Sequence, residues 1–104
     1  MARWLSRLLK RIRALSLAHR VRFTHKAYAE LAQLGLGLDP FDALHVLSHL
    51  EPSDYAGREV SDLTGEWMYV FTPEIGEMTL YLKVILRAEC VVISFHEQGE
   101  EDDG

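Results

Sequence analysis

Residues 78–86 read MTLYLKVIL, and residues 90–96 read CVVISFH. In the first stretch apolar residues at the even positions alternate with Thr79, Tyr81, Lys83 and Ile85. An alternation of period two is typical of a β-strand whose two faces meet different surroundings. The second stretch is almost continuously apolar, as expected of a strand buried within a sheet. Because the two stretches are so close in the chain, they predict an antiparallel hairpin.

The turn between the two stretches decides which residues pair. A two-residue turn at Ala88 and Glu89 and a four-residue loop over residues 87–90 give the same register. Side chains directly opposite one another then have Cβ atoms about 4.5–5.5 Å apart. The predicted opposing pairs are Tyr81 with His96, Lys83 with Ser94, and Ile85 with Val92.

One face of this hairpin would present a polar cluster of four side chains, namely Tyr81, Lys83, Ser94 and His96. Histidine transfers protons near neutral pH, and lysine stabilises negative charge on a phosphate group. The cluster is therefore the predicted site. The solvated face of a half-exposed strand produces the same spacing, so the pattern by itself leaves both interpretations open.

The first half of the chain predicts helices. Thr24 is the expected N-cap of a helix that ends at Gly35, where a left-handed residue is favoured. Asp39 as N-cap and Pro40 at the first helical position begin another helix, which Pro52 stops. Residues 21–23 fit a short strand or an extended connector between helices.

Residues 66–72 predict a further strand, with Trp67, Tyr69 and Phe71 on one face. We expect Trp67 and Phe71 in the core, although the aromatic residues, with Tyr55, would also suit stacking on nucleic-acid bases. Helices followed by a three-stranded antiparallel sheet predict an α+β domain with the helices on one face.

Length and composition predict one domain over residues 1–104, with a flexible acidic tail at 97–104. Cys90 is the only cysteine and lies in an apolar run, which indicates a buried thiol in a reducing compartment. No run of 18 apolar residues is present, so we expect no membrane span and a cytoplasmic protein. The basic leader also fits a mitochondrial transit peptide by composition.

Charge is divided unevenly along a chain of net charge -5. Residues 1–26 hold eight of the 11 basic residues and no acid, whereas all 16 acidic residues follow them. From Trp4 to Leu15 the apolar residues share one side of a predicted helix and the basic residues the other. A nucleic-acid surface, a membrane-surface helix and a solvated helix back all fit this pattern. A further, less common alternative is an acidic tail that folds back and masks the basic helix.

His45 and His49 stand one helical turn apart, a spacing that can hold a metal ion. Neither a Glu-x-x-His partner nor a cysteine pair accompanies them. We therefore expect ordinary surface or packing roles for both histidines and no metal site.

The order of several short motifs resembles the MqsR toxins of bacterial toxin–antitoxin systems. The matching residues run from Val21 to His96. They include Leu34-Gly35-Leu36, Asp39, Ser53-Asp54-Tyr55, Trp67, Val70-Phe71, Tyr81-Leu82-Lys83 and Ile93-Ser94-Phe95. The resemblance implies a RelE-like α+β fold, cleavage of messenger RNA without a metal or cofactor, and a cognate antitoxin as partner.

Carried over by position, the active tyrosine of the family falls on Tyr81 and its C-terminal strand lysine on His96. A second family lysine falls near Gly57 or Arg58, and a family glutamine falls on Met68. The resemblance thus implies Tyr81, His96 and Arg58 as catalytic residues. The expected substrate-binding residues are Met68, from its family position, and Lys83 and Ser94, from the predicted polar cluster.

The resemblance implies an endoribonuclease, for which we expect a reaction in which a ribose 2′-OH attacks the adjacent phosphorus. His96 would act as general acid or base, while Tyr81, Arg58 and Lys83 would bind the phosphate. Dependence on the ribosome stays open. The alternative function is a non-catalytic module that binds RNA or a protein partner through a degenerate toxin site.

Overall fold

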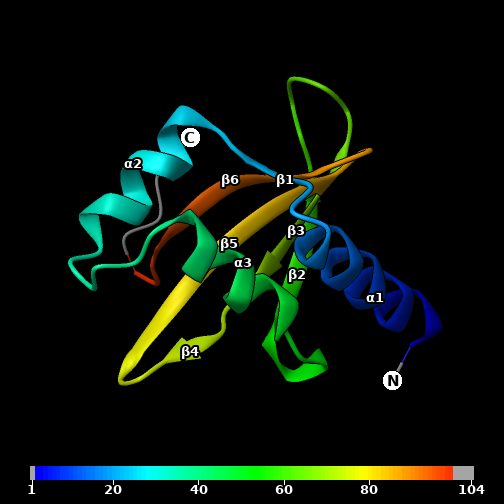
Figure 1. The fold of residues 1–104 in the computed structure, drawn as a ribbon. Helices are drawn as coiled ribbons and strands as arrows, with labels where there is room; N and C mark the ends of the chain where they lie inside the picture. The colour runs from blue at the N-terminus through cyan, green and yellow to red at the C-terminus, as the bar shows by residue number, and fades with distance from the viewer. Residues whose placement is uncertain (1, 100–104) are drawn as a thin grey trace.

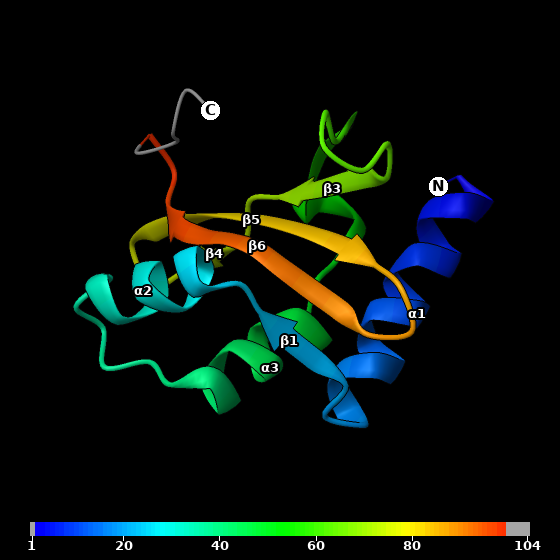
Figure 2. The same cartoon turned by 90° about the horizontal axis from the view of Figure 1, so that it is seen from above.

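The computed structural model describes residues 2–99, which form three helices and a six-stranded sheet. The strand order is β1 (Val21–Phe23), β6 (Cys90–Glu97), β5 (Met78–Leu86), β3 (Trp67–Phe71) and β2 (Tyr55–Val60), and the short strand β4 (Glu74–Ile75) pairs with β5 outside this path. Helices α1 (Arg3–Leu17) and α3 (Pro40–Ser48) lie on one side of the sheet, and α2 (His25–Gln33) lies beside β6 (Figures 1 and 2). The predicted α+β class, with helices packed on the sheet, is confirmed.

The helices begin and end close to the predicted residues. They are α1 (Arg3–Leu17), α2 (His25–Gln33) and α3 (Pro40–Ser48), and a 3-10 turn, η1, covers Pro52–Asp54. The Thr24 hydroxyl accepts a hydrogen bond from Ala27 N, and Asp39 forms a reciprocal capping box with Asp42. Gly35 adopts a positive φ of 74° after α2, where the absence of a β-carbon removes the steric penalty.

The strands are β1 (Val21–Phe23), β2 (Tyr55–Val60), β3 (Trp67–Phe71), β4 (Glu74–Ile75), β5 (Met78–Leu86) and β6 (Cys90–Glu97). The predicted three-stranded meander is therefore incomplete: β1 adds parallel to β6, and β2 adds antiparallel to β3 as an edge strand. Glu97 is paired with Leu80, so it belongs to β6 and not to a frayed tail. Residues 100–104 of the predicted tail lie outside the described residues.

The β5–β6 hairpin differs from the prediction at its turn. Leu86 pairs with Cys90, which leaves the three residues 87–89 as the connection. The register then shifts between Lys83 and Val84, so that Ile93 is an extra residue in β6. Ile85 consequently pairs with Val91, and the predicted pair Ile85–Val92 is wrong. The three-residue turn and the extra residue shift the register by one residue in opposite directions. Beyond the bulge the predicted register is therefore restored, and Tyr81 pairs with His96 as predicted.

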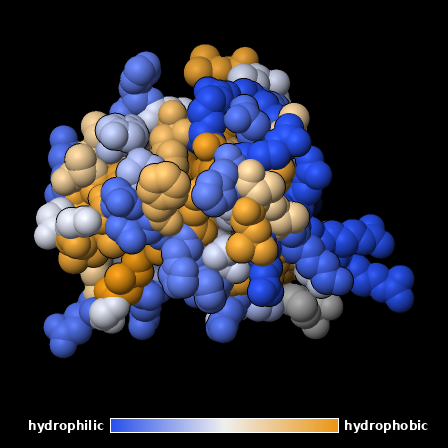
Figure 3. Space-filling view, viewed as in Figure 1, coloured by the Kyte–Doolittle hydropathy of each residue, from blue (hydrophilic) through white to orange (hydrophobic). Residues whose placement is uncertain are grey.

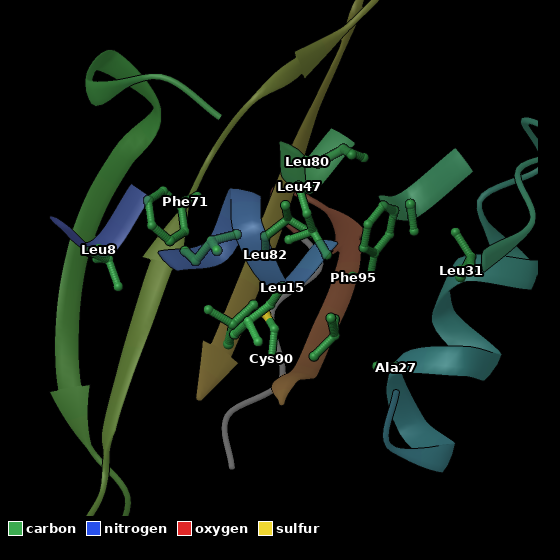
Figure 4. Close-up of a cluster of buried hydrophobic side chains, with 14 of the residues drawn as sticks. Leu8, Leu15, Ala27, Leu31, Leu47, Phe71, Leu80, Leu82, Cys90 and Phe95 are labelled. Carbon is green, nitrogen blue, oxygen red and sulfur yellow. The ribbon is translucent and has the colours of Figure 1, made fainter. Parts of the chain in front are cut away.

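The hydrophobic core lies between the sheet and helices α1 and α3, with α2 contributing at the side of β6 (Figure 4). The apolar side of α1 is buried in it through Leu5, Leu8, Ile12 and Leu15. Phe71, Leu80, Leu82, Val84, Val92 and Phe95 supply the fully buried sheet side. Phe71 was correctly predicted to be buried, but Trp67 is 44% exposed, because it lies at the far end of β3.

Replacing Phe71 by Ala should lower the free energy of unfolding by about 3–5 kcal/mol, because it removes a fully buried ring that contacts Tyr55. Urea denaturation followed by circular dichroism measures the loss. Leu63→Ala is the matched control, because Leu63 is 96% exposed and its truncation should change stability by less than about 0.5 kcal/mol. Equal effects of the two substitutions would contradict this description of the core.

Candidate functional site

The polar cluster forms as its spacing predicts. Tyr81 pairs with His96, and Lys83 pairs with Ser94, across neighbouring antiparallel strands. Leu82 and Phe95, which lie between them along the strands, are fully buried against the helices. Because successive side chains of a strand point to opposite faces, the cluster lies on the face of the sheet away from α1 and α3. We call this side the open face.

Tyr81 and His96 form a stacked pair. Their ring centroids are 5.1 Å apart, and the two ring planes differ by 16°. The His96 ring is held from two sides: Nδ1 donates a hydrogen bond to the Glu97 carbonyl at 2.9 Å, and Nε2 lies 4.0 Å from Oε2 of Glu30. His96 is only 6% exposed. The ring orientation is therefore determined before any ligand arrives.

Lys83 is the cation at the centre of the cluster. Its Nζ lies 2.6 Å from Oε1 of Glu59 and 5.7 Å from the centroid of the Tyr81 ring. Burial by itself would lower the pKa of Lys83, but the hydrogen bond with Glu59 and the interactions with Tyr81 outweigh it and raise the pKa above its usual value. Lys83 is therefore protonated at neutral pH, and it can stabilise negative charge but cannot act as a base.

Helix α2 adds two residues that the sequence did not indicate. Lys26 Nζ donates a hydrogen bond to Ser94 Oγ at 3.2 Å and lies 3.0 Å from Oε2 of Glu30. The other carboxylate oxygen of Glu30 accepts a hydrogen bond from Phe95 N at 3.0 Å. Lys26 and Glu30 are four residues apart, a spacing that allows an ion pair within a helix. Nothing in the sequence, however, indicates that this helix lies beside the second half of β6.

A cleft of about 510 Å³ opens beside the cluster. Lys26 lines one side, and residues 59–63 of β2 and the β2–β3 loop line the other. Tyr81, Lys83, Ser94 and Met68 also line it, so Met68 does lie with the other predicted site residues. Met68 pairs with Glu59 and Val70 pairs with Lys83, which puts Met68 and Glu59 on the open face.

The structure does not bring Arg58 to the polar cluster. Arg58 pairs with Tyr69, which in turn pairs with Val84, so its side chain points to the helical side of the sheet. There its guanidinium lies over the rings of Trp4 and Trp67, at 5.2 and 4.1 Å from their centroids. The neighbouring Gly57 has no side chain, so neither position suggested by the resemblance places a cation in the cleft.

His45 lies on α3, and His49 is the C-cap residue of the same helix. The rings of His45 and His49 are 4.1 Å apart, and Nδ1 of His49 lies 2.8 Å from the His45 carbonyl oxygen. Within residues 2–99, no group of three or more His, Cys, Asp or Glu side chains is arranged to hold a metal ion. Cys90 is fully buried, and burial raises the pKa of its thiol to about 12, so it is not a nucleophile at neutral pH.

Comparison with known families identifies the chain. Residues 6–97 match the family model for MqsR toxins, described as motility quorum-sensing regulator, toxin of MqsA. The chain belongs to this family. It is thus a toxin of a toxin–antitoxin system, and an antitoxin is its implied partner. No curated protein matches the sequence.

The family match covers every element that builds the cleft of this MqsR-family toxin, from α2 to the end of β6. Among the helices described for residues 2–99, none has the length and apolar character needed to cross a membrane. The apolar side of α1 is instead buried in the core of the toxin.

Substituting Glu30 tests the connection between α2 and β6 in this toxin. Glu30→Ala should lower the free energy of unfolding by about 1–3 kcal/mol, because it leaves the Phe95 amide without its acceptor. Glu30→Gln retains an acceptor oxygen and should lower the free energy of unfolding distinctly less than Glu30→Ala does. Urea denaturation of both variants measures the difference. Equal losses would show that the charge of Glu30, and not its hydrogen bond to Phe95, stabilises this contact.

Proposed function

We propose that this toxin is an endoribonuclease that cleaves messenger RNA in the cytoplasm. The observation that carries the proposal is the polar cluster itself, in which Tyr81 and a protonated Lys83 line a cleft and His96 stacks on the Tyr81 ring. Membership of the MqsR toxin family supports it. A protonated lysine beside a proton-transferring histidine suits reactions at a phosphodiester, where charge develops on oxygen.

In the proposed reaction the 2′-OH of a ribose attacks the adjacent phosphorus. The new P–O2′ bond forms as the P–O5′ bond breaks, which leaves a 2′,3′-cyclic phosphate and a free 5′-OH. One proton leaves the 2′-OH and one reaches the 5′ oxygen. His96 performs one of these transfers and water the other, so the step needs no metal or cofactor.

The other residues of the cleft bind and orient the RNA. Lys83 stabilises the negative charge of the phosphate, and Lys26 on α2 supplies a second cation at the cleft. Tyr81 fixes the His96 ring by stacking on it. The thioether of Met68 offers an apolar surface to a base, and Ser94 holds Lys26 in place.

Replacing His96 by Ala should reduce the rate of RNA cleavage by about 10²-fold or more, because one proton transfer loses its catalyst. Gel analysis of a labelled RNA incubated with the purified toxin, without ribosomes, measures the rate. His45→Ala removes a histidine of α3 outside the cleft and should leave the rate unchanged. Unchanged cleavage by the His96 variant would exclude His96 from proton transfer.

Replacing Glu59 by Gln should tighten RNA binding by about two- to fivefold. The Glu59 carboxylate neutralises Lys83 and competes with an RNA phosphate for it. Fluorescence anisotropy of a labelled RNA measures the affinity. Glu74→Gln removes one negative charge from β4 and should have a smaller effect, since Glu74 lines a different pocket. Weaker binding by the Glu59 variant would mean that Glu59 contacts the RNA favourably.

A second candidate function is a module that binds RNA or a protein partner without cleaving it. Two observations favour it: Glu59 already neutralises Lys83, and His96 is almost fully buried. Expression of the toxin in cells, with and without its antitoxin, together with the cleavage assay distinguishes the two functions. Growth arrest with RNA cleavage supports the endoribonuclease, whereas RNA binding without cleavage supports the second candidate.

A further inference from the structure

Both tryptophans of the chain lie together on the surface, on the helical side of the sheet. Trp4 is 43% exposed and Trp67 is 44% exposed, and the guanidinium of Arg58 lies over both rings. We call these three residues the tryptophan–arginine stack. Large aromatic rings that stay this exposed, with a planar cation between them, offer flat faces to which further planar groups can add.

The stack adjoins a row of cations on α1. Arg7 follows Trp4 by one helical turn, and Arg3, Lys10 and Arg13 extend the exposed basic side. Within the described residues, none of these four cations has an ion-pair partner. Hydrophilic side chains extend from this side of the molecule in the space-filling view (Figure 3).

This charge pattern opposes the stability of α1. Like charges three or four residues apart repel, and Arg3 places a cation in a first turn that contains no acidic residue. A polyanion bound along this side would remove both penalties. Because local rules are often broken at functional surfaces, the uncompensated charge indicates a negatively charged ligand.

The exposed rings favour single-stranded RNA over other polyanions. A membrane surface would need a free apolar helix side, but that side of α1 is buried in the core. An acidic protein would satisfy the cations without using the flat faces of Trp4 and Trp67. Unpaired bases use both, because they stack on aromatic rings while their phosphates meet basic side chains.

A second groove, of about 310 Å³, adjoins the cleft and extends to the edge strand β2. Tyr81 and Glu59 line both the cleft and this groove, and Gly57 and Arg58 line the groove. A β-carbon at Gly57 would meet no atom within 4 Å, so the groove is open at this point. Along β2, Glu59 faces the cleft and the adjacent Arg58 faces the stack, so an RNA strand that crosses this edge reaches both.

We propose that the tryptophan–arginine stack, with Arg7 beside it, binds nucleotides of a single-stranded RNA that leaves the cleft across β2. The inference rests on the proposed function for the choice of RNA as ligand. It adds a second contact surface, in which bases stack on Trp4 and Trp67 and phosphates pair with Arg7. In this proposal Arg58 helps to bind the RNA, on the opposite side of the sheet from the reacting phosphate.

The test uses a labelled single-stranded DNA oligonucleotide, which lacks the 2′-OH and cannot be cleaved by the proposed reaction. Binding should quench the tryptophan fluorescence of the protein, because the two tryptophans of the stack are the only tryptophans in the sequence. Trp67→Ala should weaken binding by roughly 5- to 100-fold, as expected for the loss of a stacking platform. Phe41→Ala removes an exposed ring on α3 and should leave the affinity unchanged.

A charge-matched pair of variants tests the role of α1 without touching the stack. Arg7→Glu should weaken binding more than Arg13→Glu, because Arg7 lies one turn of α1 from Trp4 and Arg13 lies further along the same helix. Arg7→Ala should also reduce the slope of log affinity against log salt by about 0.7, the value for one phosphate contact of a single strand. Thermal unfolding of each variant verifies that α1 stays folded.

Three outcomes would overturn the inference: no quenching on binding, equal affinities of the Trp67 and Phe41 variants, or equal quenching by polyglutamate. The last outcome would identify an acidic protein surface as the ligand. Failure of the proposed function would look different, because the wild-type toxin would then leave RNA uncut while the DNA probe still quenched its fluorescence.

Discussion

The extra residue Ile93 in β6 governs which side chains reach each side of the sheet. A strand alternates its side chains strictly, so Val92 and Phe95, three residues apart, share the buried side only because of this bulge. Without it, the connection at residues 87–89 would send Ser94 toward the helices and Phe95 toward the cleft. The bulge thus serves the core and the polar cluster at once, and the pairing of Tyr81 with His96 depends on it.

Helix α2 performs a similar double role at the outer edge of β6. β1 pairs with the first part of β6 and then ends, which would leave the later amides of β6 without partners. The carboxylate of Glu30 accepts a hydrogen bond from Phe95 N, in place of the carbonyl that a neighbouring strand would supply. The same carboxylate holds Lys26 beside Ser94 and lies near His96. Protection of a strand edge and organisation of the cleft therefore come from one side chain.

The basic side chains of the toxin have different surroundings in the cleft and on α1. In the cleft, each described lysine is close to a carboxylate, since Lys83 pairs with Glu59 and Lys26 with Glu30. On α1, by contrast, the basic side chains face solvent while the apolar side of the same helix completes the core. β2 is the edge at which these two surfaces meet, because Arg58 and Glu59 point to opposite sides of it. The family residue expected near Gly57 or Arg58 thus has no counterpart in the cleft.

Local features could be predicted from the chain alone: the helix limits set by Thr24, Gly35 and Asp39, the strand alternation in β5, and the membership of Tyr81, Lys83, Ser94 and His96 in one cluster. Caps and alternation act within a few residues, so they can be read from the chain. Packing in the folded protein sets the turn at residues 87–89, the bulge that compensates for it, and the placement of Arg58, Trp67 and α2. Each of these features depends on contacts between segments that are far apart in the chain. Packing outweighs local preference at such contacts, so they cannot be predicted from a local sequence pattern.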